Sequence, residues 1–331
     1  MIFEADSQEI RWAIELLDNG WRGRAQRTLE AAHGVGIFER LGEGTASDER
    51  LAADLDLEPA AVGKVLIVLA AMGLLDRDGD AWRLTPKAEA TLLPAAPHYQ
   101  GNMLVHQANV WSFWSDLEAV LQGKTGGWVF DPNGRPFLRS HRDFVLGMHN
   151  IAMAGRAADL AERVDLTGRH TLADVGGGPG TYAMALCERY PDLTATVMDL
   201  PETVAIARDV IERLGMSHRV RTAVCDWKAD EFGTGNDVVL MSSVLHGPRS
   251  EAEMKLAKAH RSMKAGGLLV IQDFLMNAAK TGPLVPALFN IMVGAFSVPE
   301  LAGRIEHAGF AGVQVRPMPD YAGTTVLTAT K

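Results

Sequence analysis

Short apolar runs alternate with amphipathic stretches along the second half of the chain, from about residue 171 onward. Five runs have the length and composition of buried strands, and helical periodicity fills the intervals between them: TLADV, TATVMDL, RVRTAVC, DVVLMSSVL and LLVIQDFL. The final stretch, from VQVRPMP to GTTVLTATK, predicts two adjacent strands that form a closing hairpin. Because strands alternate with helices, we expect an α/β fold with a doubly wound, mostly parallel sheet and helices on both of its faces.

The first 95 residues show helical periodicity with one small β element. Helices are predicted at about 7–17 and 22–35, and two more in TASDERLAADLDL and LEPAAVGKVLIVLAAMGLL. The stretch DRDGDAWRLTP then predicts a hairpin that turns at Asp78-Gly79. Helix, turn, helix and two-stranded wing is the element order of a winged helix, so we expect a winged-helix-like, mainly helical N-terminal domain.

The winged-helix order raises the question of DNA binding, and the composition argues against it. The helix that would enter the major groove, Ala60–Met72, carries Lys64 as its only charge. A groove-reading helix needs polar and basic side chains, and the whole chain has a formal net charge of -9. We therefore expect no nucleic-acid partner. The apolar helices Ile10–Leu17 and Ala60–Leu75 are expected to be buried in a homodimer. A ligand-sensing winged-helix regulator is the alternative from another functional class.

Residues 96–165 are predicted to be a helical connector between the N-terminal domain, residues 1–95, and a catalytic domain, residues 166–331. The connector contains the loop GKTGGWVFDPNGRP and many bulky side chains: His98, Tyr99, His106, Trp111, Phe113, Trp114, Trp128, Phe130, Phe137, Phe144, Met148 and His149. Such side chains are as consistent with a packed core as with a ligand site. Because ligand pockets are often found between domains, we expect the connector to line the pocket for a small-molecule substrate.

Composition sets further limits. Hydrophobic residues make up 47% of the chain and charged residues 22%, as in an ordinary globular protein. There is no signal-peptide pattern and no apolar run of membrane-spanning length, so we expect a cytoplasmic protein without a membrane partner. The two cysteines, Cys187 and Cys225, form no CxxC pair, and the histidines lack the spacing of a zinc site. We expect buried thiols and no metal.

The most informative stretch is LADVGGGPGTYAMAL, which joins a predicted strand to a predicted helix. It has the spacing acid-x-Gly-x-Gly-x-Gly, formed by Asp174, Gly176, Gly178 and Gly180. Glycines permit positive φ and the close approach of a ligand to the backbone, and ligands of open α/β sheets bind at such strand ends. A dinucleotide-binding loop would have glycine where this chain has Thr181, so a pyrophosphate-containing cofactor is disfavoured.

Two acidic residues follow at the ends of the next two predicted strands. The carboxylate of Asp199 can accept hydrogen bonds from both hydroxyls of a ribose, and Asp226 with Trp227 offers an acid and an aromatic face for adenine. Taken alone, Asp199 is equally consistent with a helix N-cap before Pro201, and Asp226 with a solvated loop. Together with the glycine loop, the two acids indicate an adenosine that lacks a pyrophosphate, which describes S-adenosylmethionine.

Four segments, in this order, resemble the class I small-molecule O-methyltransferases: DVGGGPGTYA, VMDLPETVAIAR, CDWKADEFGTGNDVVLMSSVLHGPRSEAE and MKAGGLLVIQD. More narrowly, they are similar to the homodimeric group that contains plant caffeate-type, acetylserotonin and bacterial polyketide or phenazine enzymes. The resemblance covers nearly the whole chain. It implies S-adenosylmethionine as cofactor, S-adenosylhomocysteine as product and an aromatic or polyketide-like hydroxyl as methyl acceptor. Further cofactor contacts are expected at Leu200 and Ser242.

The resemblance also implies a general base. The family's histidine in the matching position removes the proton of the acceptor hydroxyl, and here that residue is His246. The family usually continues with Asp-Trp, whereas this chain has Gly247-Pro248. Asp273 and Glu300 are two open candidates for the acid that orients His246.

Acceptor contacts are expected on both sides of the glycine loop, at Met148, His149, Asn290 and Met292, and His149 is a second candidate base. The segment around Phe296 is shorter than in the family. Because of these departures, N- or C-methylation, or cofactor binding without methyl transfer, is the alternative within the same fold.

Overall fold

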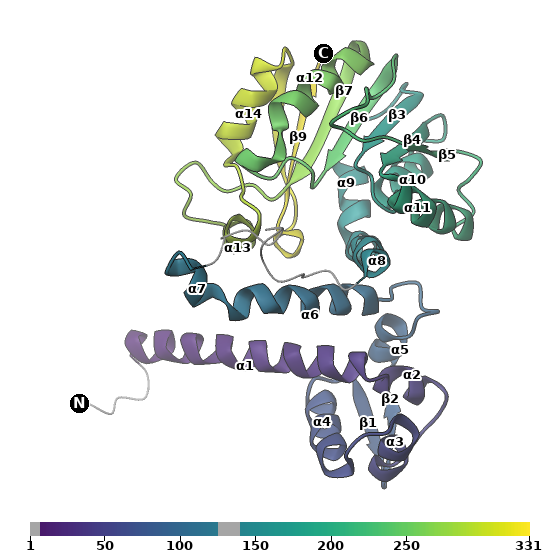
Figure 1. The fold of residues 1–331 in the computed structure, drawn as a ribbon, viewed down its shortest axis with the longest axis vertical. Helices are drawn as coiled ribbons and strands as arrows, with labels where there is room; N and C mark the ends of the chain where they lie inside the picture. Colours follow the sequence, from purple (N-terminus) through teal and green to yellow (C-terminus); the bar gives the residue numbers. More distant parts are fainter. Residues whose placement is uncertain (1–6, 125–139) are drawn as a thin grey trace. The chain divides into compact units, whose positions relative to one another are not determined.

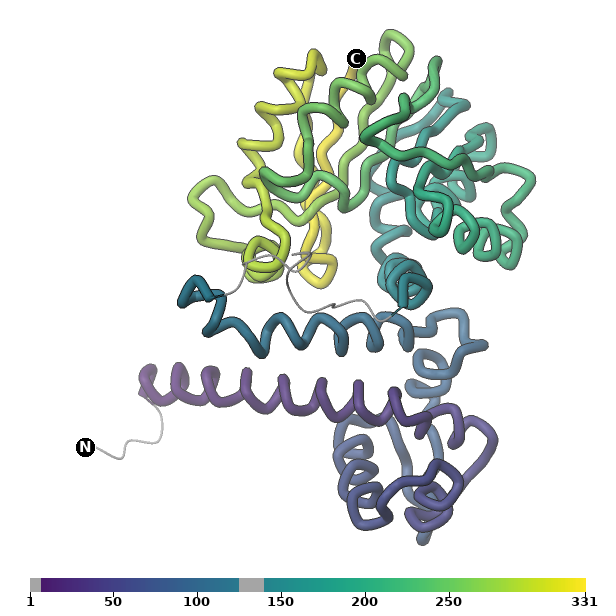
Figure 2. Tube along the Cα trace, in the orientation of Figure 1, coloured from purple at the N-terminus to yellow at the C-terminus, as the bar shows by residue number. Residues whose placement is uncertain are grey.

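The computed structural model describes residues 7–124 and 140–331 and divides into two compact units, residues 1–108 and 109–331. Figure 1 labels the elements of each unit, and Figure 2 traces the chain through them. The boundary between the units falls inside the connector predicted from the sequence. Trp128, Phe130 and Phe137, with the connector loop beyond Lys124, lie outside the described residues.

The N-terminal unit is mainly helical and contains one two-stranded sheet (Figure 1). Its elements are α1 (Gln8–Gly34), α2 (Ile37–Gly42), α3 (Asp48–Leu55), α4 (Pro59–Ala71), β1 (Leu75–Asp78), β2 (Ala81–Leu84), α5 (Pro86–Leu92) and the start of α6 (Gly101–Ser115). As predicted, α3 and α4 are followed by an antiparallel hairpin. Phe38, Leu51, Leu66 and Trp82 belong to the single apolar core of this unit.

The prediction of two helices over residues 7–35 was wrong, because α1 is one continuous helix of 27 residues. Gly20 lies between the two predicted helices, but a glycine inside a helix costs only about 1 kcal/mol relative to alanine and does not end it. An ion pair between Arg22 Nε and Asp18 Oδ2, 2.8 Å apart and one turn away from each other, spans the glycine.

The second unit is built on a seven-stranded sheet of order β5-β4-β3-β6-β7-β9-β8. Its strands are β3 (Thr171–Val175), β4 (Thr194–Asp199), β5 (Val220–Val224), β6 (Asn236–Ser242), β7 (Met263–Asp273), β8 (Ala311–Pro317) and β9 (Thr325–Thr330). The first five are parallel, and β8 and β9 are paired antiparallel at the far edge. The predicted mostly parallel sheet and its C-terminal hairpin are confirmed.

Helices cover both faces of this sheet (Figure 1). On its two faces lie α9 (Ala157–Arg163), α10 (Thr181–Arg189), α11 (Pro201–Arg213), α12 (Ala252–Ser262) and α14 (Val298–His307). The other helical segments of the unit are α7 (Leu117–Leu121), α8 (His141–Ile151), a π-turn (Ala152–Arg156) and α13 (Leu284–Met292). One apolar core joins the sheet to α9, α10 and α11, and a second joins it to α12 and α14. Within β3, Leu172 belongs to the first core and Ala173 to the second, as the two-residue period of a strand requires.

The order of the strands reverses beside β3, which has β4 on one side and β6 on the other. At such a switch point the loops that follow neighbouring strands diverge and leave a crevice at the carboxyl ends. The loops after β3, β4, β5, β6 and β7 therefore emerge at one edge, and they carry most of the predicted site residues. No helix within residues 7–124 and 140–331 combines the length and apolar composition needed to cross a membrane.

At the amino ends of the parallel strands, Asp237 holds three strands together. Its Oδ2 accepts hydrogen bonds from the backbone N–H groups of His170 and Thr171 at 2.9 and 3.0 Å, and its Oδ1 accepts one from Lys264 Nζ at 2.8 Å. Burial alone would raise the pKa of Asp237, but these donors outweigh it and lower the pKa to about 2. The starts of β3, β6 and β7 are thereby joined through one carboxylate.

We predict that Asp237→Asn lowers the free energy of unfolding at pH 7 by about 1–3 kcal/mol, because backbone donors then face an amide instead of a charged acceptor. The native pKa lies below the unfolded value, so the stabilisation is complete above about pH 4 and is lost as the pH falls toward 2. Urea denaturation at pH 7 and pH 3 measures both effects. Asp192→Asn, at an exposed position, is the control, and an equal loss in both variants would contradict the prediction.

Candidate active site

The glycine loop joins β3 to α10 and needs its glycines. Gly176, Gly178 and Gly180 have φ values of 66°, 54° and 76°, in the left-handed region that favours glycine. A Cβ on Gly176 would lie 2.7 Å from Val244 Cγ1 and 3.0 Å from Trp227 Cζ3. The loops after β5 and β6 therefore lie directly against the glycine loop, and this bare backbone surface suits the close approach of a ligand.

Asp174 lies beneath the loop and is almost completely buried, with 1% of its surface exposed. Its Oδ2 accepts no hydrogen bond from the described residues, and a Cβ on Gly177 would lie 2.5 Å from it. Burial and, to a smaller extent, the negative charge of Asp199 raise the pKa of Asp174 to about 7. A buried carboxyl group with an unpartnered oxygen beside a glycine loop fits a ligand that carries positive charge, as S-adenosylmethionine does.

Asp199, at the end of β4, is joined to the glycine loop by a hydrogen bond. Its Oδ2 accepts a hydrogen bond from Gly178 N at 2.9 Å, and its Oδ1 accepts one from Leu200 N at 2.8 Å. The N-cap of α11 is Leu200, and its side chain makes no capping hydrogen bond. Asp199 is therefore not the N-cap of this helix, which was the alternative left open by the sequence. The carboxylate is held at the crevice instead.

Asp226 and Trp227 follow β5 in a tight turn. Asp226 Oδ1 accepts a hydrogen bond from Lys228 N at 2.9 Å, and the Trp227 ring lies 3.8 Å from Lys255 Nζ. Lys258 Nζ donates to the carbonyl groups of residues 227, 228 and 230. The two buried lysines, one turn apart on α12, therefore fix the loop that carries Trp227.

The sequence analysis did not single out these lysines. Lys255 Nζ also donates to the Val244 carbonyl at 2.8 Å, so the same side chain holds the loop after β6. Burial lowers the pKa of Lys255 to about 8. A signal was present in the sequence, because lysines 255 and 258 fall on the same side of the helix as the buried residues Leu256 and Ala259, where exposed charges are not expected.

His246 follows β6 and is oriented by Asp273, which ends β7. His246 Nδ1 lies 2.7 Å from Asp273 Oδ1. Asp273 is fully buried and also accepts hydrogen bonds from Leu245 N at 2.9 Å and Phe274 N at 2.8 Å. Because an ionised carboxylate only accepts hydrogen bonds, Nδ1 carries the proton and Nε2 is left as a proton acceptor.

Of the two open candidates for the orienting acid, the structure therefore selects Asp273. Glu300 has another role, since its carboxylate accepts hydrogen bonds from Ser297 N and Oγ at the start of α14 and pairs with Lys280. It is a capping residue and does not contact His246.

The two departures from the family pattern are linked in space. Gly247 has φ 51°, and a Cβ there would lie 2.8 Å from both Ala295 N and Gly294 C. The turn before α14, at residues 294 and 295, thus passes directly over Gly247. Asn290 Oδ1 accepts a hydrogen bond from Ala295 N at 3.0 Å and so holds this turn, while the side chain of Asn290 is exposed.

Aromatic and apolar side chains surround His246. Phe274 and Phe289 are stacked with 3.9 Å between ring centroids and 12° between planes. The His246 ring lies 5.2 Å from Phe289 and 6.4 Å from Phe274. A small apolar cluster continues from Phe289: Val110, Phe113, Trp114, Met292 and Val293. These residues form an apolar wall beside the histidine, and Met292 belongs to it.

The remaining predicted residues lie in different surroundings. His149 is buried, and its Nδ1 lies 2.8 Å from Thr181 Oγ1 at the start of α10. Burial, with a smaller effect of the Arg213 charge, lowers the pKa of His149 to about 4, which makes it a poor base near neutral pH. Met148 is half-buried on α8, and Ser242 ends β6 with its hydroxyl buried. Within the described residues, no group of three or more His, Cys, Asp or Glu side chains is placed to hold a metal ion.

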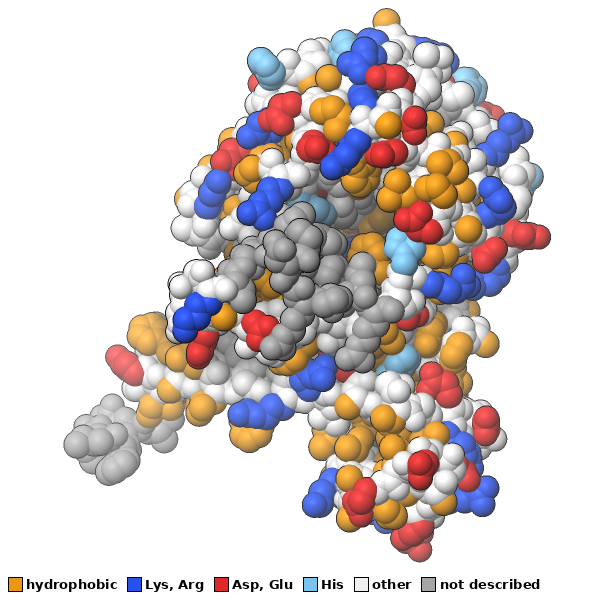
Figure 3. Space-filling view, viewed as in Figure 1, with side chains coloured by type: hydrophobic (Ala, Val, Ile, Leu, Met, Phe, Trp, Pro, Cys, Tyr) orange, Lys and Arg blue, Asp and Glu red, His pale blue; other side chains and the backbone are white. Residues whose placement is uncertain are grey.

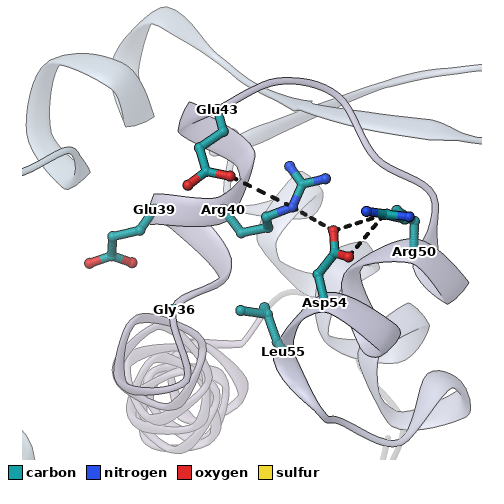
Figure 4. Close-up of a pocket in the computed structure, with 7 residues that line it drawn as sticks. All are labelled: Gly36, Glu39, Arg40, Glu43, Arg50, Asp54 and Leu55. Carbon is teal, nitrogen blue, oxygen red and sulfur yellow. Dashed lines mark hydrogen bonds and ion pairs between the residues drawn. The ribbon is translucent and has the colours of Figure 1, made fainter.

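A hollow on the N-terminal unit is a different kind of site (Figure 4). Asp54 bonds Arg40 Nε at 2.7 Å and Arg50 Nε at 2.9 Å, and Glu43 lies 4.0 Å from Arg40. With Glu39, the lining of this hollow has three acids against two arginines, so it carries no excess of positive charge. On the face of the second unit in Figure 3, basic and acidic side chains are likewise interspersed among the coloured residues. Neither surface resembles the basic footprint of a nucleic-acid-binding protein.

Comparison with known proteins points to one family. The family model described as an O-methyltransferase domain matches residues 137–300. The chain is 33% identical over 277 residues to the 3-hydroxy-5-methyl-1-naphthoate 3-O-methyltransferase of Streptomyces sahachiroi, covering 82% of this chain and 80% of that protein. A solved structure of an O-methyltransferase family protein from Burkholderia thailandensis has a TM-score of 0.79 and 25% identity, covering 96% and 98% of the two chains. Human N-acetylserotonin methyltransferase in complex with S-adenosylmethionine has the same fold, with a TM-score of 0.83 at 21% identity over 99% of both chains.

We predict that the affinity for S-adenosylmethionine falls as the pH drops from 8 to 6. The pKa of Asp174 is near 7, and a cationic ligand favours its ionised form, so affinity falls by up to about tenfold per pH unit below the pKa. Calorimetric titration across this range measures the dependence, and Asp174→Asn should abolish it. The control is Asp209→Asn, at an exposed acid on α11. A wild-type affinity that does not change between pH 6 and 8 would contradict the linkage.

Proposed function

Because the chain belongs to the family of S-adenosylmethionine-dependent O-methyltransferases, we propose that it methylates a hydroxyl group of an aromatic or polyketide-like small molecule, with His246 as general base. The observation that carries this proposal is the pair of His246 and Asp273 at the crevice that also holds the glycine loop. Val244, two residues before the histidine, lies against Gly176. A base and a cofactor loop are therefore neighbours.

The cofactor would be held by residues from the loops after β3, β4, β5 and β6. We assign the backbone of the glycine loop, with Asp174 beneath it, to the charged amino-acid end of the cofactor. Asp199 suits the ribose hydroxyls, because its carboxylate is fixed by Gly178 and remains partly exposed. The adenine would be held by Asp226, Trp227 and Leu200. Ser242, at the end of β6, completes the proposed set.

The chemistry needs a proton acceptor in the right place. When bound, S-adenosylmethionine supplies an electrophilic methyl group that is transferred by in-line displacement at carbon. His246 Nε2 accepts the proton of the acceptor hydroxyl, and the Asp273 carboxylate stabilises the imidazolium that forms. The hydrogen bonds that Asp273 accepts from Leu245 N and Phe274 N hold this carboxylate in a fixed position.

The acceptor is expected to be largely apolar and aromatic. The stacked pair Phe274 and Phe289 offers flat apolar surface beside His246, and the half-buried Met292, in the cluster that continues from Phe289, adds adaptable surface. Met148 stays a predicted acceptor contact on α8. The named relative from Streptomyces sahachiroi acts on a hydroxylated naphthoate, an acceptor of this chemical kind. His149 and Asn290 were predicted as acceptor contacts, but each already makes a hydrogen bond within the protein, His149 with Thr181 and Asn290 with Ala295. We assign them a structural role in place of acceptor contact.

We predict that His246→Gln lowers kcat/KM for a hydroxylated aromatic acceptor by about 10²- to 10⁴-fold, the usual contribution of a positioned general base. Asp273→Asn should cause a loss in the same range, because an amide that donates to Nδ1 forces the proton onto Nε2. Methyl-transfer assays with hydroxynaphthoates and related phenols measure both. The affinity for S-adenosylhomocysteine should be unchanged in each variant.

Two results would overturn this assignment. If His246→Gln retained wild-type kcat/KM, the base would be another group or none. If only amines or ring carbons were methylated by the wild-type protein, the hydroxyl acceptor would be wrong and the alternative within the same fold would stand.

We further propose that the chain forms a homodimer through α1. Hydrophobic side chains reach the surface of the N-terminal unit (Figure 3). On α1 alone Trp12, Leu16, Leu17 and Trp21 are each more than half exposed. So much exposed apolar surface on one helix is unusual for a monomer and typical of an interface. A second copy of the chain, with the same surface, would cover it symmetrically.

The homodimer predicts a particle of twice the chain mass in size-exclusion chromatography with light scattering at micromolar concentration. Replacing both Trp12 and Leu16 by Glu should convert it to a folded monomer, because two charges cannot be buried unpaired in an apolar interface. Ala53→Glu, at an exposed position on α3, is the control and should remain dimeric. A monomeric wild-type chain would rule the proposal out.

A further inference from the structure

Arg156 is a buried arginine that pairs with no acid of residues 7–124 and 140–331. Only 8% of its surface is exposed, and within the described residues no carboxylate accepts a hydrogen bond from its guanidinium group. It ends the π-turn between α8 and α9, immediately after Gly155, whose φ of 103° breaks the helix. A Cβ on Gly155 would lie 2.5 Å from the Tyr321 hydroxyl, so this kink depends on glycine. The chain therefore keeps a helix break directly before a buried positive charge.

The acid one helical turn away on the same segment is already engaged elsewhere. Asp159, one turn after Arg156, accepts hydrogen bonds from Arg163 Nη1 at 3.0 Å and from the Tyr321 hydroxyl. The polar neighbours of Arg156 are the hydroxyl groups of Tyr182 and Tyr321, and that of Tyr182 itself accepts a hydrogen bond from Gln272 Nε2 at 3.1 Å. A neutral hydroxyl does not balance the charge of a buried guanidinium. A buried guanidinium lowers the stability of the folded protein unless a negatively charged group pairs with it.

Arg156 borders the same aromatic side chains as His246. Its Cζ lies 5.5 Å from the centroid of the Phe274 ring, which is stacked on Phe289 and lies 6.4 Å from the His246 ring. Tyr182 lies in the first turn of α10, directly after the glycine loop. The guanidinium therefore lies where the apolar wall beside the proposed base meets the cofactor loop.

We propose that Arg156 binds a carboxylate of the methyl acceptor, and that the acceptor is an aromatic hydroxy acid. This inference rests on the proposed function. A guanidinium group offers paired N–H donors that match the two oxygens of a carboxylate, and burial beside apolar rings strengthens the interaction. A bound aromatic acid would satisfy the charge of Arg156 and pack its ring against Phe274. The cofactor also has a carboxylate, in its amino-acid part, so the test separates the two sources.

The experiment compares matched ligands. Calorimetry on the protein saturated with S-adenosylhomocysteine measures the binding of 3-hydroxy-1-naphthoate and 2-naphthol, which differ only in the carboxylate, and of one-ring and three-ring pairs built the same way. We expect the wild type to prefer the acid of at least one pair by roughly 10- to 100-fold, the value of a buried charge-assisted hydrogen bond. Arg156→Met should abolish the preference, and Arg156→Lys should retain part of it.

The cofactor is tested separately with S-adenosylhomocysteine and 5′-methylthioadenosine, which lacks the amino-acid part. If Arg156→Met weakens S-adenosylhomocysteine binding alone and leaves the acceptor preference intact, the carboxylate belongs to the cofactor and the proposal is overturned. Equal wild-type affinity for acid and neutral ligand in every pair also overturns it. Arg163→Met is the matched control, because that arginine already bonds Asp159 and the Pro317 carbonyl; it should leave every preference unchanged.

These readouts do not depend on methyl transfer. A preference for acids that requires Arg156, found in a protein that methylates no hydroxyl, would support the anion site while the proposed function failed. If the protein methylated the hydroxyl of neutral phenols and bound acids no more tightly than neutral ligands, the proposed function would stand and the anion site would fail.

Discussion

The buried carboxylate of Asp273 is the group on which the arrangement of the site depends. It is fully buried at the end of β7 and accepts hydrogen bonds from Leu245 N, Phe274 N and His246 Nδ1. A buried charge without such donors would be strongly unfavourable, so the loop after β6 must stay against the end of β7. The pairing of Ser242 with Gln272 in the neighbouring strands sets that distance. The orientation of His246 therefore follows from the hydrogen bonds that the buried Asp273 carboxylate requires.

The rest of the crevice is held by the same kind of interaction. Lys255 and Lys258 reach from α12 to backbone carbonyls of the loops after β5 and β6, and Asp199 reaches from β4 to the glycine loop. Each charged side chain satisfies backbone groups that have no partner in regular structure. Loops that would otherwise be mobile thus become a rigid frame, which is what positioning of two reactants requires. The close contact of Gly247 with residues 294 and 295 adds the turn before α14 to this frame.

The sequence predicted the second unit well because its signals are local. Buried parallel strands are continuous apolar runs, and the glycine loop and Asp199 each follow such a run directly. The unbroken helix α1 could not be predicted in the same way, since one glycine is too weak a signal to decide between one helix and two. The choice of Asp273 over Glu300 depends on which strand end faces the histidine, and that is a property of the folded sheet. Arg156 was missed because a lone arginine at a helix break has no pattern; only its burial without an acid makes it notable.

The central claim is that the histidine fixed by Asp273 removes the acceptor proton. A crystal structure of the protein with S-adenosylhomocysteine and an aromatic hydroxy acid tests it most directly. The account predicts that the acceptor hydroxyl lies about 2.6–3.2 Å from His246 Nε2, within hydrogen-bonding reach of a general base, while Nδ1 remains on Asp273. An acceptor hydroxyl bound to another side chain, with His246 turned away from it, would contradict the account.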